Sequence, residues 1–452
     1  MDNTGAAVSG ATVIVTDNQT GKERTVVTNS DGTYEVSQLE FGTYTVKITA
    51  NGFKTYSATE LKIDAGREYS LNAALEVGAV TEQVTVTAGS ETINSTTAEL
   101  STTVSPQQIK ELPLNGRNPL SLLNLQAGVN ATSGSINGQR TSSVNYTRDG
   151  LNVQDNFIRN GFVSDQPTVD DTGEFTVVTQ NANADQGQGG STQVQLVTPR
   201  GGKDFHGALY AFNRNSKFTA NSYLNNAGNI AKPFLNRNQF GGSISGPVPF
   251  PVFGEGTPYF NKDKTFFFFN YEGFRLANQV TITGLTTLLP AAQNGTFTYT
   301  GTDGVVRTVN VLTGAGFDLS TTARQNEFNN SGGVLSVDPI IQSRILSRLP
   351  ATGNTTTFTG TNFLQGYSIN RSNPEQRDAF TTRFDAELND TNSFNFVFKR
   401  NNIKDARTDI AAGFLPTTTV DQGGPTNLFS GAYRIALGSN FSNEIRGGFQ
   451  YA

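Results

Sequence analysis

The first part of the chain consists of short segments in which hydrophobic and polar residues alternate. Alternation with a period of two predicts strands that bury one face. Turn sequences such as Asn29-Ser30-Asp31-Gly32 separate these segments at intervals of about ten residues, a spacing that favours a β-sandwich. Residues 1–76 are therefore predicted to form a small sandwich. Its strands are expected at residues 11–16, 22–28, 34–36, 44–48 and 71–75.

The middle of the chain combines turn sequences with short helical signals. Residues 107–112 predict a helix that ends at Pro113, because the residue before a proline disfavours helical geometry. Residues 105–200 are predicted to form a separate α+β domain. The polar stretch at residues 77–104 is predicted to be a linker. Turns are expected at Asn115-Gly116 and Asp149-Gly150.

Two faces of opposite character mark the last part of the chain, residues 204–452. In residues 383–388 apolar side chains alternate with charged ones, and residues 394–399 repeat the pattern after a short turn. Strands of about ten residues with one apolar face are typical of outer-membrane proteins. A soluble sandwich gives the same alternation, so the pattern alone leaves both open. Residues 281–374 are less periodic and predict long extracellular loops, with a helix at 338–349.

Composition narrows the class of protein. The chain has 452 residues, of which only 16% are charged, and it contains 47 glycines and 32 phenylalanines. Many aromatic residues argue against disorder, and many glycines argue against a helical protein, so the fold class is mainly β. The net charge of −5 and the absence of a basic run argue against nucleic-acid binding. No apolar run reaches the roughly 18 residues of a membrane helix, so membrane contact requires a closed barrel or association.

Patterns for catalysis or metal binding are missing from the sequence. The chain has no cysteine and one histidine, His206, with no carboxylates at matching spacing around it. There is no nucleophile elbow, and Gly202-Lys203 is followed by Asp204 where a phosphate loop requires Ser or Thr. We therefore expect neither an enzyme nor a cofactor or metal site.

The predicted sandwich resembles a known family. The resemblance rests on four motifs in order: Gly10-Ala11-Thr12-Val13, residues 28–34, residues 41–46 and Gly52-Phe53-Lys54. Together they resemble a carboxypeptidase-regulatory-like domain, which is a transthyretin-like β-sandwich. This resemblance implies an accessory domain without catalytic residues. Compared with the family, the first strand is expected to be missing.

Motifs beyond residue 105 resemble those of Oar-like TonB-dependent outer-membrane receptors. The plug motif consists of Leu112, Pro113, Leu114, Asn115, Gly116, Arg117 and Asn118, with Asp149 and Gly150 further on. The resemblance implies a plug domain at residues 105–200, followed by antiparallel barrel strands, the first at residues 206–215, 236–247 and 265–273. Barrels of this kind have about 22 strands. The 204–452 segment is too short for that number, so we expect an incomplete barrel and a chain that is a piece of a longer protein.

A short alternating run after the sandwich resembles a TonB box. The run consists of Glu82, Gln83, Val84, Thr85, Val86, Thr87 and Ala88. A TonB box is an extended peptide that pairs with a sheet edge of the energy-coupling protein. The alternatives are a last strand of the sandwich and an ordinary linker.

The resemblance implies energy-coupled uptake of an unidentified extracellular ligand through the outer membrane. Its implied partners are a TonB-type energy-coupling protein and outer-membrane lipid, with the sandwich and the coupling peptide in the periplasm. A surface adhesin built from soluble β-sandwich domains is the alternative from another class. A carbohydrate-active enzyme is disfavoured, because no carboxylate pair is recognisable and the chain has no tryptophan.

Overall fold

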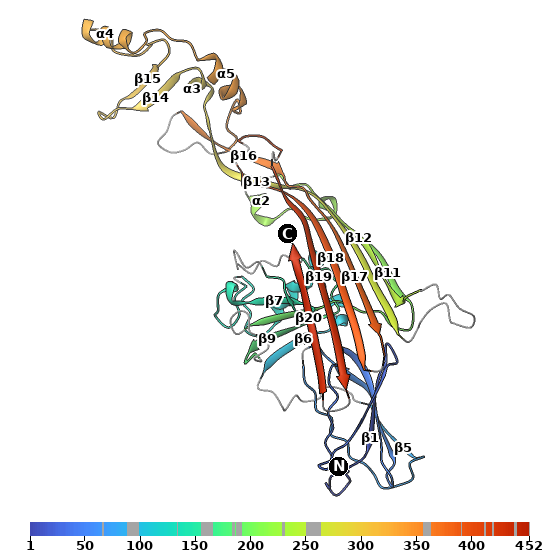
Figure 1. The fold of residues 1–452 in the computed structure, drawn as a ribbon. Coiled ribbons are helices and arrows are strands. Elements are labelled where there is room, and N and C mark those ends of the chain that lie inside the picture. Colours follow the sequence, from blue (N-terminus) through green and yellow to red (C-terminus); the bar gives the residue numbers. More distant parts are fainter. Residues whose placement is uncertain are drawn as a thin grey trace.

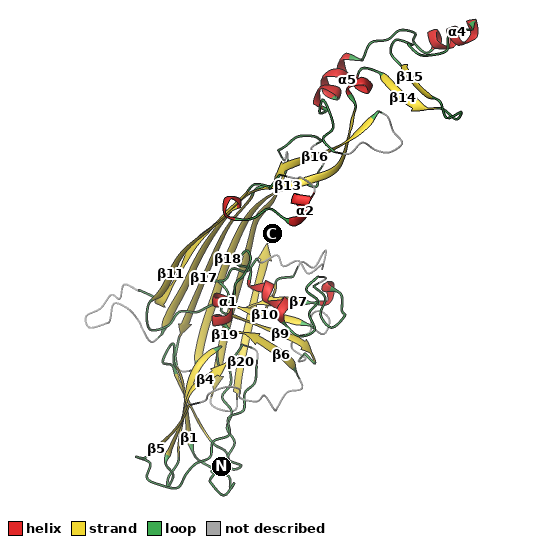
Figure 2. Ribbon diagram, turned by 180° about the vertical axis from the view of Figure 1, so that it is seen from behind, coloured by secondary structure: helices red, strands yellow, loops and turns green. Residues whose placement is uncertain are grey.

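The computed structural model of the chain describes residues 1–65, 67–87, 99–132, 134–154, 166–182, 186, 192–227, 231–249, 264–355, 363–389, 391–410, 413–417, 420–437 and 441–451. The strands form two five-stranded sheets, one larger antiparallel sheet and a separate hairpin. In Figure 1 the first sheet lies beyond the lower end of the large sheet, and the hairpin lies far beyond its upper end. The second five-stranded sheet lies against the large sheet, as Figure 2 shows from behind.

The first sheet has the strand order β2-β1-β3-β4-β5. Its central strands β1 and β3 bury alternate residues, including Val13, Val46 and Ile48, as the period-two pattern predicts. The last strand, β5, pairs with β4 in parallel and lies at the edge. The strands span Thr12–Asp17 (β1), Glu23–Val27 (β2), Gly42–Thr49 (β3), Thr55–Ile63 (β4) and Gln83–Thr87 (β5).

Two of the strands expected in the sandwich are not strands in the structure. Residues 34–36 and 71–75 form no regular ladder with a neighbour among the described residues. Their apolar side chains pack against the buried core instead, and the Tyr34 hydroxyl donates to the carbonyl of Leu71 at 3.3 Å. The alternating pattern therefore predicts correctly that one face of these segments is buried. It does not guarantee a strand, because a strand also needs a neighbouring segment as a backbone hydrogen-bond partner.

The second sheet has the order β6-β9-β10-β7-β8 and packs against helix α1 and the 3-10 helix η1. Phe175, Val177 and Val194 are fully buried, and Ile109 of α1 closes the same core. We call residues 100–197 the inner unit. Its elements are β6 (Leu100–Val104), α1 (Pro106–Glu111), η1 (Pro119–Leu125), η2 (Thr141–Ser143), β7 (Asn145–Arg148), β8 (Leu151–Asn152), β9 (Glu174–Gln180) and β10 (Gln193–Val197).

The helix predicted at residues 107–112 is α1. The side chain of Ser105 caps its first turn, and the helix ends just before Pro113, as expected from the proline. The end of the expected linker differs from the prediction, because Leu100–Val104 is a strand of the inner unit. Val104 is buried there and β6 pairs with β9.

The large sheet is antiparallel throughout, in the order β11-β12-β13-β17-β18-β19-β20, with β16 paired to the upper part of β13. Within the described residues β11 and β20 each pair with one strand, so the sheet is open. Its strands span His206–Asn215 (β11), Leu235–Pro247 (β12), Thr265–Leu288 (β13), Leu364–Ser372 (β16), Glu375–Glu387 (β17), Asn392–Ala406 (β18), Asp421–Leu437 (β19) and Phe441–Tyr451 (β20).

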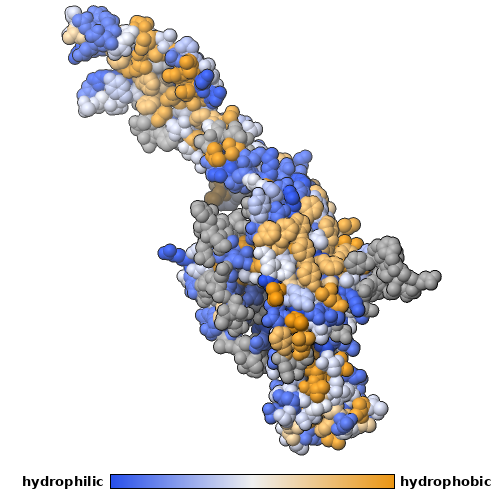
Figure 3. All heavy atoms as spheres, in the orientation of Figure 1, coloured by the Kyte–Doolittle hydropathy of each residue, from blue (hydrophilic) through white to orange (hydrophobic). Residues whose placement is uncertain are grey.

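The two faces of this sheet differ as the sequence predicts. Phe267, Phe384 and Phe396 are register partners across β13, β17 and β18 and share the outer face. Lys399 and Arg383 lie on the inner face and are buried. Figure 3 shows hydrophobic residues gathered over the outer face of the sheet, between hydrophilic zones above and below.

An arm extends from the upper end of the large sheet. The upper part of β13 pairs with β16, and the β14–β15 hairpin follows beyond it (Figure 1). The helix predicted at residues 338–349 is present as α5 and η4. No helix among the described residues is both long and apolar enough to cross a membrane. The remaining elements are η3 (Ser216–Phe218), α2 (Tyr223–Ala227), α3 (Pro290–Gln293), β14 (Thr296–Thr300), β15 (Val306–Asn310), α4 (Thr322–Asn330), α5 (Pro339–Arg344) and η4 (Leu346–Arg348).

Candidate functional site

A buried ion cluster joins the inner unit to the large sheet. Asp171, in the loop before β9, lies 2.6 Å from the Nζ of Lys399 and 3.4 Å from a guanidinium nitrogen of Arg148. The hydroxyl of Thr381 donates to the same carboxylate at 3.1 Å. All four side chains are almost completely buried. Lys399 and Thr381 belong to the sheet, whereas Asp171 and Arg148 belong to the inner unit, so the cluster crosses the interface.

The charges in this cluster determine the ionisation of Asp171. Burial by itself raises the pKa of its carboxyl, but the positive charges of Lys399 and Arg148 lower the pKa further than burial raises it. The pKa therefore lies below the usual range for aspartate, and Asp171 is ionised at neutral pH. A buried charge is tolerated only when it is paired and hydrogen-bonded. The inner unit and the large sheet must therefore stay in contact for the charges of Asp171 and Lys399 to remain compensated.

The Asn115-Gly116-Arg117 turn of the plug motif faces the large sheet. Gly116 has φ +93° and Arg117 has φ +53°, and the left-handed region is readily open only to the glycine. Arg117 lies 2.6 Å from Asp170 and 3.9 Å from Glu272 of β13. Its guanidinium also stacks over two rings of β11, 4.4 Å from the centroid of Tyr210 and 4.6 Å from that of Phe212.

The other two residues of this turn bind the sheet directly. The side-chain oxygen of Asn115 accepts hydrogen bonds from Arg214 at 3.0 Å and from Arg237 at 3.2 Å. The carbonyl of Gly116 accepts one from the amide of Gln239 at 3.1 Å. The turn therefore contacts the inner faces of β11, β12 and β13.

The remaining residues of the motif's first stretch shape the inner unit itself. Leu112 and Pro113 end α1, and Leu114 packs against the core of the inner unit. Asn118 caps η1 by accepting from the backbone of Leu120 at 3.0 Å.

The Asp149-Gly150 turn joins β7 to β8, with φ +48° and +79°. Asp149 accepts from the backbone nitrogen of Thr198 at 2.9 Å and from its hydroxyl at 2.5 Å. Arg446 of β20 donates to the carbonyl of Asp149. A Cβ at position 150 would lie 2.6 Å from the Cδ of Arg446, so a larger residue would displace this arginine as well as strain the backbone at φ +79°.

The coupling peptide occupies the edge of the first sheet. Gln83–Thr87 forms β5, in register with Thr55–Thr59 of β4. Glu82 lies 3.3 Å from Lys54, and Ala88 falls outside the described residues. In the structure the peptide is therefore the last strand of the sandwich, which was the alternative to a TonB box in the sequence analysis. Binding of a coupling protein by this peptide stays a prediction.

A second charged seam joins the first sheet to the lower end of the large sheet. Glu40 pairs with Arg434 and lies 3.6 Å from Arg383, and Asp17 lies 2.7 Å from Arg200. Burial raises the pKa of Glu40, but the neighbouring arginines lower it well below its usual range. The cavity at this seam is lined by side chains of both parts, including Tyr44, Phe266 and Asn395.

The first sheet also contacts the inner unit. The backbone N–H of Ala65 donates to the carboxyl of Glu174 at 2.6 Å. Burial raises the pKa of Glu174 to about 7, although this hydrogen bond opposes the shift. Glu174 is the first residue of β9, so a titratable group lies where the two units meet.

Sequence reasoning missed the Asp171–Lys399 pair and the Glu40 seam. Asp170 and Asp171 are adjacent in the chain and contact different partners, Arg117 and Lys399. For Lys399 a signal was available, because it is a lysine on the inner face of an alternating strand. Nothing in the sequence indicated that Asp171 is its partner. Among the described residues no group of acidic or histidine side chains is arranged to hold a metal ion.

Comparisons with known proteins match both ends of the chain. Residues 197–452 match the family described as "Outer membrane beta barrel domain", and residues 1–76 match "Carboxypeptidase regulatory-like domain". The TonB-dependent transporter Oar of Myxococcus xanthus is 25% identical over 240 residues, which are 50% of this chain and 22% of that protein. The chain thus spans less than a quarter of the length of this curated relative.

Two solved structures are similar to part of this chain. The outer membrane transporter YddB of Escherichia coli is 12% identical, with a TM-score of 0.42, over 77% of this chain and 38% of that chain. The siderophore receptor PirA of Pseudomonas aeruginosa is 14% identical, with a TM-score of 0.32, over 77% of this chain and 47% of that chain.

Proposed function

We propose that this chain, which belongs to the outer membrane β-barrel domain family, acts in TonB-dependent, energy-coupled uptake of an extracellular ligand across the outer membrane. The outer face of the large sheet meets outer-membrane lipid, and the first sheet lies in the periplasm. A TonB-type energy-coupling protein supplies the energy. The similarity to a curated TonB-dependent transporter supports this assignment.

The observation that carries the proposal is the buried ion cluster around Asp171. It fixes the inner unit, as a plug, against the polar inner face of the sheet. A polar inner face suits a water-filled path, and a plug closes that path until it is moved. Transport then requires that the contacts between Asp171, Lys399 and Thr381 open or rearrange.

The assignment gives each part of the chain a role. The sandwich at residues 1–76 is an accessory domain, and residues 77–104 link it to the plug and carry the coupling peptide. The plug comprises residues 105–200, and residues 204–452 supply part of the barrel wall and extracellular loops. In the resting state β5 pairs with β4, and its exposed edge offers the coupling protein a strand to extend.

A lock between plug and wall tests the mechanism. Gln166 of the inner unit accepts a hydrogen bond from Arg377 of β17, and the native chain contains no cysteine. We expect a bifunctional methanethiosulfonate crosslinker to stop uptake by a Gln166→Cys/Arg377→Cys variant and a reductant to restore it, because the bridge between the two thiols prevents plug movement. The reporter is a compound whose cellular accumulation depends on the intact gene, and each single-cysteine variant is the control. Unchanged uptake by the crosslinked pair would refute the mechanism.

The adhesin alternative is not favoured. It requires soluble sandwich domains after residue 204, whereas the strands there form one open sheet with an apolar outer face and belong to a barrel family. The relatives are transporters and receptors. The identity of the ligand is not indicated by the resemblance.

A further inference from the structure

Two arginines stand side by side on the inner face of the large sheet, near its upper end. Arg214 of β11 and Arg237 of β12 are direct register partners. Both donate to the same neutral acceptor, the side-chain oxygen of Asn115. Like charges placed directly opposite each other destabilise a sheet, so this pair needs an explanation other than strand pairing.

No acid neutralises this pair among the described residues. Neither arginine has a carboxylate within ion-pair distance, in contrast to Arg117 nearby, which Asp170 and Glu272 compensate. Residues 205–249, which make the whole β11–β12 hairpin, contain no aspartate or glutamate. The same hairpin holds Lys217 and Lys232, and the Nζ of Lys232 donates only to backbone carbonyls. The hairpin is therefore a local region of uncompensated positive charge.

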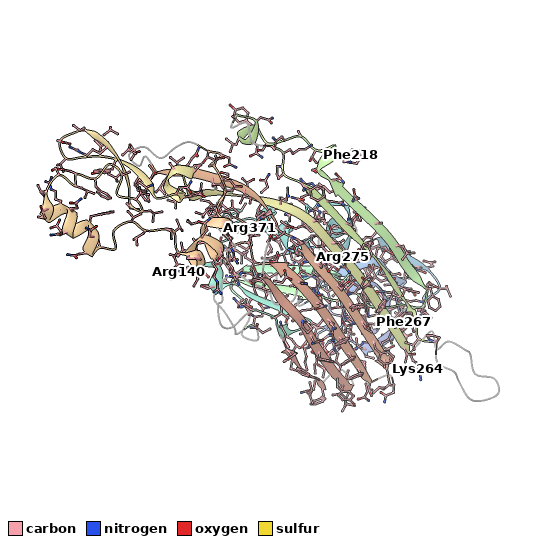
Figure 4. All side chains as sticks on the ribbon, turned by 90° about the horizontal axis from the view of Figure 1, so that it is seen from above. Arg140, Phe218, Lys264, Phe267, Arg275 and Arg371 are labelled. Atoms are coloured by element: carbon pink, nitrogen blue, oxygen red, sulfur yellow. The ribbon has the colours of Figure 1, made fainter. Side chains whose placement is uncertain are left out.

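The arginine pair is open to a ligand but closed to membrane lipid. Their bonds to Asn115 of the inner unit place both on the inner side of the sheet, away from the apolar outer face. Arg214 is exposed and Arg237 is half-buried. Phe218 and Tyr223, in the connection above, are 89% and 83% exposed, and Figure 4 shows Phe218 beyond the end of the sheet strands. Cationic and exposed aromatic side chains thus lie on the same β11–β12 hairpin.

We propose that Arg214 and Arg237 form a recognition site for a multivalent oxyanion, namely the phosphate or carboxylate groups of the ligand. This inference rests on the proposed uptake function and names the chemical class of its substrate. Two guanidinium groups present parallel N–H donors that match phosphate or carboxylate oxygens. In the absence of ligand, Asn115 holds both groups in place, and a bound anion would replace its weaker neutral acceptor. Because Asn115 belongs to the plug motif, ligand binding would then loosen one contact between plug and wall.

Calorimetric titration of the purified protein in detergent, with inorganic pyrophosphate or citrate as the probe, tests the site without any transport step. We expect Arg214→Gln/Arg237→Gln to weaken binding about tenfold or more, since each charge-assisted hydrogen bond contributes strongly. The matched control is Arg344→Gln/Arg348→Gln, which removes two exposed arginines from the arm and should bind as the native protein does. Binding should also weaken as salt concentration rises.

A measurement on the native protein keeps the test decisive even if the arginine variant fails to fold. Bound pyrophosphate should slow hydrogen exchange in peptides that cover residues 210–217 and 235–239. Absence of binding by the native protein, or equal binding by the arginine variant, would overturn the proposal. The test is independent of uptake. If the anion binds but the plug lock leaves uptake unchanged, the transport mechanism is wrong and the anion site stands. If the plug lock stops uptake but no anion binds, the anion site is wrong and the transport mechanism stands.

Discussion

At the scale of single residues, the interface between the inner unit and the large sheet depends on a few buried charges. Asp171 is satisfied by Lys399 from the sheet and by Arg148 from its own unit. Replacing one member of such a cluster leaves the others buried without compensation, which costs more than the pair itself contributes. These residues therefore report on docking of the inner unit against the sheet more sensitively than exposed ion pairs do.

Lys399→Met should lower the free energy of unfolding by about 3 to 5 kcal/mol, because it leaves Asp171 short of its closest partner. Lys404→Met on the same strand is the matched control. Lys404 is mostly exposed, so its pairing with Asp421 at 3.0 Å contributes less than about 1 kcal/mol. Urea unfolding in detergent measures both. Equal losses in the two variants would contradict the assigned role of the buried cluster.

The contribution of Glu174 to the stability of the protein should depend on pH. The pKa of Glu174 is about 7 in the folded protein against a reference value of 4.5, so the folded state binds more protons between these values. Its contribution to stability is fully present below pH 4.5 and is lost as pH rises through about 7. We expect the free energy of unfolding, measured with urea in detergent, to fall over this range. In Glu174→Gln this fall should be smaller, and an unchanged fall in the variant would assign the titration to another group.

At the scale of elements, alternation predicted β17 and β18 of the large sheet and the first three strands of the sandwich, and the family resemblance indicated β11, β12 and β13. Alternation could not predict which segments find a backbone partner. Residues 34–36 alternate yet lack a ladder, whereas β4, which the alternation did not predict, forms a full strand between β3 and β5. Pairing depends on neighbours that are distant in sequence, and periodicity carries no information about them.

The candidate site was predictable only in part for the same reason. The plug motif identified the Asn115-Gly116-Arg117 turn, since a turn signal is local. Its contacts with Arg214, Arg237 and Tyr210 join segments that are far apart in the chain. No local pattern encodes them.

Strand β5 allows a test of the coupling peptide. Val84→Pro removes a backbone donor from the edge strand, so pairing with a coupling protein should fail and uptake should be lost while ligand binding remains. Val84→Ala keeps the donor and should retain uptake. Accumulation of the gene-dependent compound measures both variants. Normal uptake by the proline variant would show that the coupling peptide lies elsewhere.

At the scale of the whole molecule, the outer face of the large sheet sets its position in the bilayer. The row Phe267–Phe384–Phe396 lies in the middle of the apolar face, whereas Asn402 lies above it beside Asp378. Phe396→Lys should therefore destabilise the membrane-inserted protein by about 2 to 4 kcal/mol, and Asn402→Lys by no more than about 1 kcal/mol. Unfolding from lipid vesicles measures both. Similar costs at the two positions would contradict this placement.

The length of β13 determines how far the arm extends beyond the large sheet. Only its lower half, up to Leu276, pairs with β17, and the segment from Ala277 to Leu288 continues upward with β16. At about 3.3 Å per residue this continuation raises the hairpin and helices of the arm by up to roughly 40 Å. In the proposed orientation, a structure held that far out lies well outside the bilayer on the extracellular side. Antibodies and bacteriophages would therefore meet the arm well before they reach the membrane.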